Sequence, residues 1–312
     1  MNYIVFDLEW NQCPYGKDRE VERLPFEIIE IGAVKLNQDR EKLDEFHRII
    51  KPAVYKKLHF RTKEVIRLDA EMLSQGIPFP VAVREFLNWC GPESTFATWG
   101  SVDLIELQRN MKYYGILELL KGPLHYYDVQ KLFSRCFEDG KSRKSLKYGI
   151  DFLNLEKQED FHQALADASY TAQIFQRIDP DIIRSFDSID CYQNPKSKKE
   201  EIHAVYRGYI KYISREFDSK EEAAKDREVS ATRCCICGRN AKKKIRWFSV
   251  NAKNYYSASV CPEHGLMRGK NRMKKTDEGK FFVVKTIRPM SEEELDTLRV
   301  RREQQKKKRR RK

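Results

Sequence analysis

The chain has 312 residues, which leaves room for a catalytic domain of about 180 residues and further modules. It contains no apolar stretch of about 20 residues that could span a bilayer, and Met1 leads straight into a predicted strand without a leader, so we expect a cytoplasmic protein with no membrane partner. The net charge is +13, and residues 231–312 carry 25 Lys and Arg against 8 Asp and Glu. This asymmetry favours a polyanionic partner, with a solubilising tail as the alternative.

The first predicted element is a central strand over residues 3–10, an apolar run that contains Asp7 and Glu9. Side chains alternate along a strand with a period of two, so both carboxylates lie on one face. A polar loop over 13–24 follows, and further strands are predicted over 26–36 and 46–50. The first three strands should therefore form a meander.

Helices are predicted next, at 80–90, 103–114, 128–137 and 145–153, with Asp128 and Ser145 as caps of the last two. A short strand before Gly100 delivers Asp103 to the start of the second helix. Because Asp128 caps a helix, we leave it out of the candidate site. Strands followed by strand–helix alternation predict an α/β fold, a mixed sheet with helices on both faces.

Residues 162–168 open a further helix, in which His162 lies five positions before Asp167. Buried carboxylates are costly unless a cation neutralises them, and oxygen ligands select magnesium or manganese. The sequence therefore predicts that four carboxylates hold two Mg²⁺ or Mn²⁺ ions, with His162 as general base. The assigned metal ligands are Asp7, Glu9, Asp103 and Asp167.

Each segment alone has an ordinary explanation. The Asp-x-Glu pair could lie on an edge strand, Asp103 could be a helix cap, and His162 could be a structural histidine. The chain order, the setting of each segment and the His-to-Asp interval agree, however, and together they favour the catalytic interpretation.

These motifs resemble those of the DEDDh 3′-to-5′ exonucleases, the DnaQ-like branch of the ribonuclease H-like superfamily, from residue 1 to about residue 180. The resemblance implies two bound magnesium ions and release of nucleoside 5′-monophosphates from a 3′ end. The run Thr98-Trp99-Gly100 resembles the RNA-trimming branch, which includes the bacterial KapD-like proteins. In many proofreading members small hydroxyl residues follow the first motif, whereas here Trp10, Asn11 and Gln12 follow it. The resemblance therefore does not identify the residues that bind the terminal sugar and base.

The remaining chain is expected to contain a helical connector over 181–230, because apolar residues recur at helical intervals from Ile202 to Phe217. A module over 231–290 contains Cys234-x-x-Cys237 and Cys261-x-x-His264, separated by 23 residues that include two predicted strands and followed by a possible helix. Knuckles of this spacing predict one Zn²⁺ in a zinc-ribbon or treble-clef arrangement.

Two features of this module stay open. Cys235 could replace Cys234, and the alternative to a zinc site is four unligated thiols. A capping box at Ser291 begins a basic helical tail over 291–312, which we expect to be disordered from Lys306 onward in the absence of RNA. The other four cysteines are scattered singly, which fits a reducing compartment.

Lysines, arginines and aromatic residues interleave around the predicted zinc site, a composition that suits single-stranded nucleic acid. We expect Trp247 to pack beneath the hairpin rather than to face solvent. The predicted function is a metal-dependent 3′-to-5′ exonuclease acting on single-stranded nucleic acid, with RNA favoured over DNA. The alternatives are a DNA repair or proofreading exonuclease and a catalytically silent binding scaffold; the oligomeric state stays open.

Overall fold

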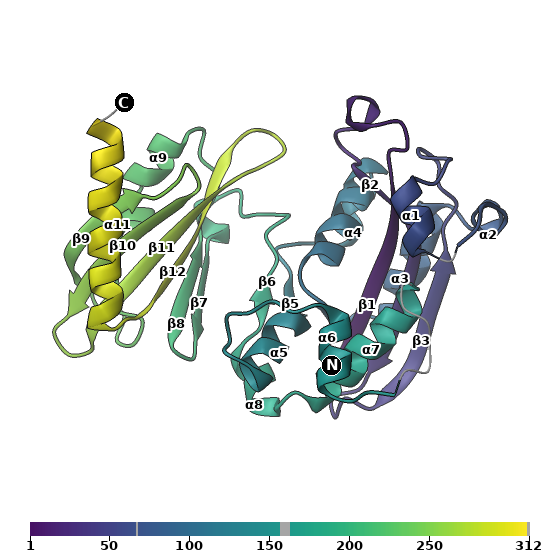
Figure 1. The fold of residues 1–312 in the computed structure, drawn as a ribbon, viewed down its shortest axis with the longest axis horizontal. Coiled ribbons are helices and arrows are strands. Elements are labelled where there is room, and N and C mark those ends of the chain that lie inside the picture. Colours follow the sequence, from purple (N-terminus) through teal and green to yellow (C-terminus); the bar gives the residue numbers. More distant parts are fainter. Residues whose placement is uncertain (67, 157–162, 311–312) are drawn as a thin grey trace. The chain divides into compact units, whose positions relative to one another are not determined.

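The computed structural model describes residues 1–66, 68–156 and 163–310, and the chain divides into two compact units, Met1–Tyr192 and Gln193–Lys312 (Figure 1). Each unit has its own six-stranded sheet. Within the described part of the chain, no helix combines the length and apolar character needed to cross a membrane. The first unit extends beyond the expected boundary at residue 180, because a short strand over 188–189 completes its sheet.

The sheet of the first unit is mixed, in the order β3-β2-β1-β4-β5-β6. Strands β1, β2 and β3 pair antiparallel as the expected meander, whereas β4 runs parallel to β1 and β5 parallel to β4. The fold is therefore the ribonuclease H-like α/β class that the sequence predicts. The strands are β1 (Asn2–Gln12), β2 (Phe26–Leu36), β3 (Lys42–Ile49), β4 (Ser94–Thr98), β5 (His125–Asp128) and β6 (Ser188–Ile189).

The helices of this unit include the four that periodicity predicts, α3 to α6, each within two residues of its expected bounds. They are α1 (Phe60–Val65), α2 (Ala70–Gln75), α3 (Phe79–Cys90), α4 (Val102–Tyr113), α5 (Val129–Phe137), α6 (Leu146–Phe152), α7 (Ala164–Arg177) and α8 (Pro180–Ser185). Short 3-10 turns lie at Lys17–Arg19 and Leu117–Leu119.

Helices cover both faces of the first sheet (Figure 1). The even-numbered side chains of β1 from Ile4 to Leu8 belong to a core shared with α3 and α4. On the opposite face, Tyr3 contacts Phe175 of α7 with a ring-centroid distance of 5.1 Å. Because side chains alternate along a strand, the odd-numbered acidic residues of β1 lie on the α7 face.

A glycine in β2 lets α7 lie directly against this face. Gly32 is paired with Asp7 across β1 and β2, and a Cβ added at Gly32 would lie 2.1 Å from the backbone nitrogen of Leu165. Backbone atoms in a packed helix cannot yield as a flexible side chain can. Gly32 therefore permits the close approach that brings the first turn of α7, and Asp167 with it, to β1.

Replacing Gly32 with alanine should displace α7 and cost both stability and activity. We expect Gly32→Ala to lower the free energy of unfolding by about 3 kcal/mol. The stabilisation by added Mn²⁺ should also shrink, because Asp167 moves away from Asp7. Thermal unfolding with and without Mn²⁺ measures both effects; a wild-type midpoint with a wild-type Mn²⁺ shift would contradict this account.

The second unit is built on an antiparallel sheet in the order β7-β8-β12-β11-β10-β9. Its core has one layer of helix on each face: α11 packs on β9 and β10, and α9 and α10 pack on the opposite face. The elements are β7 (Ile202–Tyr206), β8 (Tyr209–Ile213), α9 (Lys220–Lys225), α10 (Arg227–Ser230), β9 (Lys242–Ser249), β10 (Asn254–Cys261), β11 (Gly265–Lys275), β12 (Phe281–Pro289) and α11 (Glu292–Arg310), with a 3-10 turn at Lys198–Glu200.

Two helical predictions for this unit are wrong. The segment from Ile202 forms the β7–β8 hairpin, whose two-residue turn ends at Gly208 with φ +86°. The stretch after His264 is strand β11, in which buried and more exposed residues alternate. Apolar residues from Ile202 onward match a helical period over a few positions, but burial alternates with a period of two along β7 and β11.

The expected small zinc module is therefore part of a larger unit. Strand β8, from the predicted connector, pairs with β12, so residues 193–312 share one sheet. Helix α11 begins at the predicted capping box, where the Glu294 N–H donates to Ser291 Oγ at 3.2 Å. The helix continues to Arg310. The expectation of disorder from Lys306 onward is therefore wrong for residues 306–310.

Candidate functional site

Three carboxylates from β1 and α7 meet on one face of the first sheet. Asp7 and Glu9 extend from β1, and Asp167 lies in the first turn of α7. Each offers an oxygen that lies within 4.8 Å of the others, and all three side chains are half-buried. Oxygen atoms at this separation can share one divalent cation.

Burial and mutual repulsion both raise the pKa values of this cluster. Burial, followed by the charges of Asp103, Glu9, Asp167 and Glu30, raises the pKa of Asp7 well above its usual value. Burial and the charges of Asp167, Glu30 and Asp103 raise the pKa of Glu9 to about 8. A bound cation would offset this cost, and a donor set made of oxygen alone fits Mg²⁺ or Mn²⁺.

Asp103 lies at the edge of the cluster, in the first turn of α4, with 6% of its surface exposed. It is outside the three-residue group, but its charge is the strongest of those acting on Asp7. Burial raises the pKa of Asp103, backbone hydrogen bonds of Asp103 and Leu8 lower it, and the Asp167 charge raises it, with a result of about 7. The structure thus brings all four predicted carboxylates to one region.

The predicted general base, His162, lies outside the described residues. Its role stays a prediction from the sequence. The described chain resumes at Gln163, immediately before α7.

A fifth carboxylate, which the sequence motifs do not assign, lies beside the cluster. Glu30 of β2 is directly opposite Glu9, is 2% exposed, and raises the pKa of both Asp7 and Glu9. Its Oε1 is hydrogen-bonded to His47 Nε2 at 2.7 Å. Within the described chain, the buried Oε2 has no hydrogen-bond partner. A buried carboxylate oxygen without a hydrogen-bond partner is a further reason to expect a cation at this site. The sequence feature that could have pointed to Glu30 is a glutamate inside an otherwise apolar strand.

Asp128 has the structural role that the sequence predicts. Its Oδ1 accepts a hydrogen bond from the Lys131 N–H at 2.8 Å, which caps α5, and lies 3.3 Å from Arg143 Nη1. Ser145 caps α6 in the same way, since its Oγ accepts from the Tyr148 N–H at 3.2 Å.

A basic cleft of about 980 Å³ lies beside the end of β1. The buried Asn11 donates from Nδ2 to the carbonyls of Tyr55 and Lys57, both at 2.9 Å, and so fixes one wall two residues beyond Glu9. The Asn11 side-chain amide therefore has a structural role in this wall of the cleft. A cleft lined by several lysines suits a phosphate-bearing ligand. The lysines that line it are Lys51, Lys56, Lys57 and Lys63.

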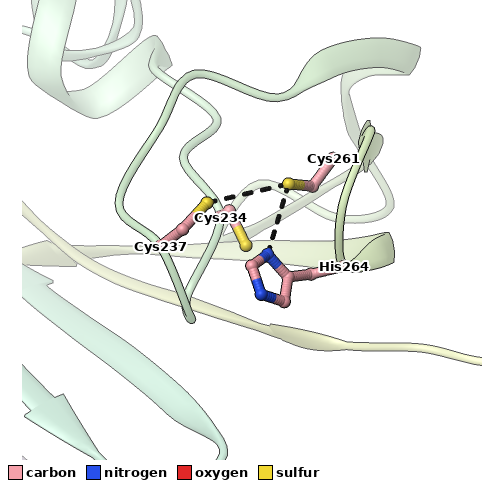
Figure 2. A group of neighbouring side chains, drawn as sticks. All are labelled: Cys234, Cys237, Cys261 and His264. Atoms are coloured by element: carbon pink, nitrogen blue, oxygen red, sulfur yellow. Dashed lines mark hydrogen bonds between the residues drawn. The ribbon is translucent and has the colours of Figure 1, made fainter.

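In the second unit, Cys234, Cys237, Cys261 and His264 converge, with their ligand atoms all within 4.8 Å of one another (Figure 2). The Sγ atoms of Cys237 and Cys261 are 3.7 Å apart, and Cys261 Sγ lies 3.6 Å from His264 Nδ1. Tetrahedral zinc with Zn–S bonds of about 2.3 Å needs sulfur atoms about 3.8 Å apart. The spacing therefore fits one Zn²⁺.

The structure separates Cys235 from this group, because the Cys235 thiol donates to Met267 Sδ at 3.6 Å.

Burial raises the pKa of Cys261, but hydrogen bonds from His264 and from the backbone of Glu263 outweigh it, so the pKa falls to about 6. The thiolate is the form that binds a metal ion.

Trp247 is packed as the sequence predicts. Its ring approaches Gly269 of β11 closely, and its indole N–H donates to the Ser230 carbonyl at 2.9 Å. A ring held in this way is not available to stack on a base.

Comparison with known proteins assigns the first unit to a family. A family model described as Exonuclease (RNase_T) matches residues 4–175. The probable 3′-5′ exonuclease KapD of Bacillus subtilis (strain 168) is 28% identical over 184 residues, which cover 57% of this chain and 84% of that protein. A PolC-type DNA polymerase III of Thermotoga petrophila is 27% identical over 238 residues, covering 68% of this chain and 16% of the polymerase.

Among solved structures, the nuclease domain of 3′hExo, a DEDDh family member bound to rAMP, is 18% identical with a TM-score of 0.48, covering 56% of this chain and 90% of that one. The family match begins in β1 and ends in α7, so it contains all three acidic segments and more than half of the chain. The chain therefore belongs to the exonuclease (RNase_T) family, and its first unit contains the exonuclease domain.

Proposed function

We propose that the chain trims the 3′ end of single-stranded nucleic acid, RNA in preference to DNA, and releases nucleoside 5′-monophosphates. The observation that carries this proposal is the convergence of the Asp7, Glu9 and Asp167 carboxylates within 4.8 Å on one sheet face. With Asp103, these residues would hold two Mg²⁺ or Mn²⁺ ions. When bound, the ions supply electrostatic stabilisation of the charge that develops on the phosphate.

The chain's own residues then divide the remaining work. His162 would accept the proton of the attacking water, because an imidazole has a pKa near neutrality. The lysines of the cleft beside β1 would bind phosphates of the retained strand. Glu30 and His47 would position Glu9 from the neighbouring strand, since Glu30 lies directly opposite it.

The preference for RNA is supported by the sequence before Asp103, which resembles the RNA-trimming branch. In this structure Thr98 Oγ1 donates to the Gly100 carbonyl at 2.7 Å, and Trp99 Nε1 donates to the Lys144 carbonyl at 3.1 Å. These bonds fix the turn that delivers Asp103. A cytoplasmic location belongs to the same proposal, because none of the eight cysteines, all of which are described, forms a disulfide.

Digestion of matched RNA and DNA single strands tests the substrate. With Mg²⁺ or Mn²⁺, a 5′-labelled RNA should shorten one nucleotide at a time and yield 5′-monophosphates, faster than the DNA of the same sequence. Faster release from DNA would support the repair or proofreading alternative instead. Absence of any metal-dependent release would revive the silent scaffold.

A further inference from the structure

Strand β11 of the second unit separates its residues into two chemically different faces. On one face, Met267 and Met273 pack against the cysteine knuckle and against α9 and α10. The other face carries a cation at every second position. We call this set the β11 ladder: Arg268, Lys270, Arg272 and Lys274.

Helix α11 covers only part of the ladder's side of the sheet. Its Leu295 and Leu298 pack on Ile245 and Ala258 of β9 and β10, and this cluster reaches β11 at Leu266. Beyond Leu266, β11 continues with the ladder. Arg272 is exposed, and Lys270 is half-buried.

Opposite Lys270, Arg272 and Lys274, the neighbouring strands supply uncharged residues, which are Asn254 and Tyr256 on β10 and Phe282, Val284 and Thr286 on β12. Arg268 lies opposite Ala258 and Arg288. Arg268 forms an ion pair with Glu294 at 3.1 Å. Among residues 1–66, 68–156 and 163–310, no acidic side chain forms an ion pair with Lys270, Arg272 or Lys274. Beyond Arg268, the ladder is therefore a row of like charges that no ion pair with a described acidic residue neutralises.

Burial and the neighbouring cations both act on Lys270, in the middle of this row. Burial lowers the pKa of Lys270, and the charges of Arg272 and Arg268 lower it further. An anionic partner that runs along the strand would relieve the repulsion and release counterions on binding.

We propose that the β11 ladder binds the phosphate backbone of the single strand whose 3′ end the first unit degrades. This inference rests on the proposed function and names a surface of the second unit that holds the substrate. Alternate residues of a strand lie about 6.8 Å apart, a spacing close to that of neighbouring phosphates in an extended single strand. Tyr256, with Arg268 and Lys270 at 5.3 and 5.9 Å from its ring centroid, borders the path beside α11.

The charge of the second unit agrees with this partner. Residues 193–312 contain 34 Lys and Arg against 16 Asp and Glu, while residues 1–192 contain 26 against 31. Net charge alone, however, would attract nucleic acid to any exposed cation. A test must therefore compare two surfaces that carry the same charge.

The test uses two double variants of the full-length protein, both with Asp7→Asn added to block cleavage. Lys270→Ala with Arg272→Ala removes two charges from the ladder. Lys225→Ala with Arg227→Ala removes two exposed charges from α9 and α10, on the opposite side of the sheet. Dissociation constants for a single-stranded RNA are measured over a series of salt concentrations, and thermal unfolding checks that each variant is folded.

The ladder variant should bind about tenfold more weakly at low salt, and its log–log salt slope should be shallower by about 1.4, or 0.7 for each lost phosphate contact. The control variant should keep the slope of the parent. Equal losses in the two variants, or an unchanged slope in a folded ladder variant, would overturn the ladder as the binding surface. That result is separable from failure of the proposed function, which would appear as no metal-dependent degradation by the protein without these substitutions.

Discussion

Asp7→Asn should abolish nucleotide release and, at the same time, stabilise the metal-free protein near neutral pH. We expect the rate to fall by a factor of about 10³ or more, because Asp7 is central to the carboxylate cluster and its loss removes a ligand that charge stabilisation requires. Stability should change in the opposite direction. Burial and the charges of Asp103, Glu9, Asp167 and Glu30 raise the pKa of Asp7, so its ionised form is unfavourable in the folded state.

The sign of the pH dependence follows from these raised values. A carboxyl group whose folded pKa exceeds its unfolded value of about 4 stabilises the fold fully at low pH, and this contribution is lost as pH rises through the folded pKa. Here the folded values are about 7 for Asp103 and about 8 for Glu9. The metal-free first unit should therefore lose stability between about pH 5 and pH 8, and Asp7→Asn should lose less.

Thermal unfolding at pH 5 and pH 8 in magnesium-free buffer measures this effect, with Mn²⁺ added at pH 8 to identify the transition of the first unit. Asp128→Asn is the matched control, because Asp128 lies outside the cluster and asparagine also caps a helix well. It should keep near-normal activity and the full pH dependence. Near-normal turnover of Asp7→Asn, or a wild-type stability that does not fall with pH, would remove the assignment of this cluster.

The sequence predicts those site residues whose positions depend only on the geometry of a single strand or helix. Asp7 and Glu9 share a face because a strand alternates, and Asp128 caps a helix because its neighbours have helical spacing. Glu30 is different. Its place beside Glu9 depends on the register between β1 and β2, which a hydrophobic pattern does not specify to the residue.

In the second unit, secondary structure also depends on contacts between distant residues, which the local sequence does not predict. The residues around Tyr209 satisfy both a helical and a strand period, and only pairing with β12 decides between them. That pairing joins Ile213 to Val284, which are 71 positions apart in the chain. The convergence of the three cysteines and His264 was predictable because their spacing is a local signature, whereas the sheet that carries them is formed by distant contacts.

Loss of the Cys237 thiolate should release zinc and destabilise the second unit by several kcal/mol. Zinc binding contributes roughly 10 to 16 kcal/mol in isolated finger peptides, but this unit also has apolar clusters beneath α11 and beneath α9 and α10, so part of its structure should survive. The region most affected should be the apolar cluster that contains Met267 and Ile287, which packs directly against the cysteines.

Cys235→Ser is the matched control for Cys237→Ser. Both substitutions change one cysteine of the same segment, but the Cys235 thiol contacts Met267 while Cys237 Sγ lies 3.7 Å from Cys261 Sγ. Elemental analysis should find one zinc per chain in wild type and in Cys235→Ser, and much less in Cys237→Ser, whose unfolding midpoint should fall. Equal zinc loss in both variants would return Cys235 to the ligand set. Full zinc content in Cys237→Ser would refute a site made of the three cysteines and His264, because a tetrahedral ion that loses one of four protein ligands binds much more weakly.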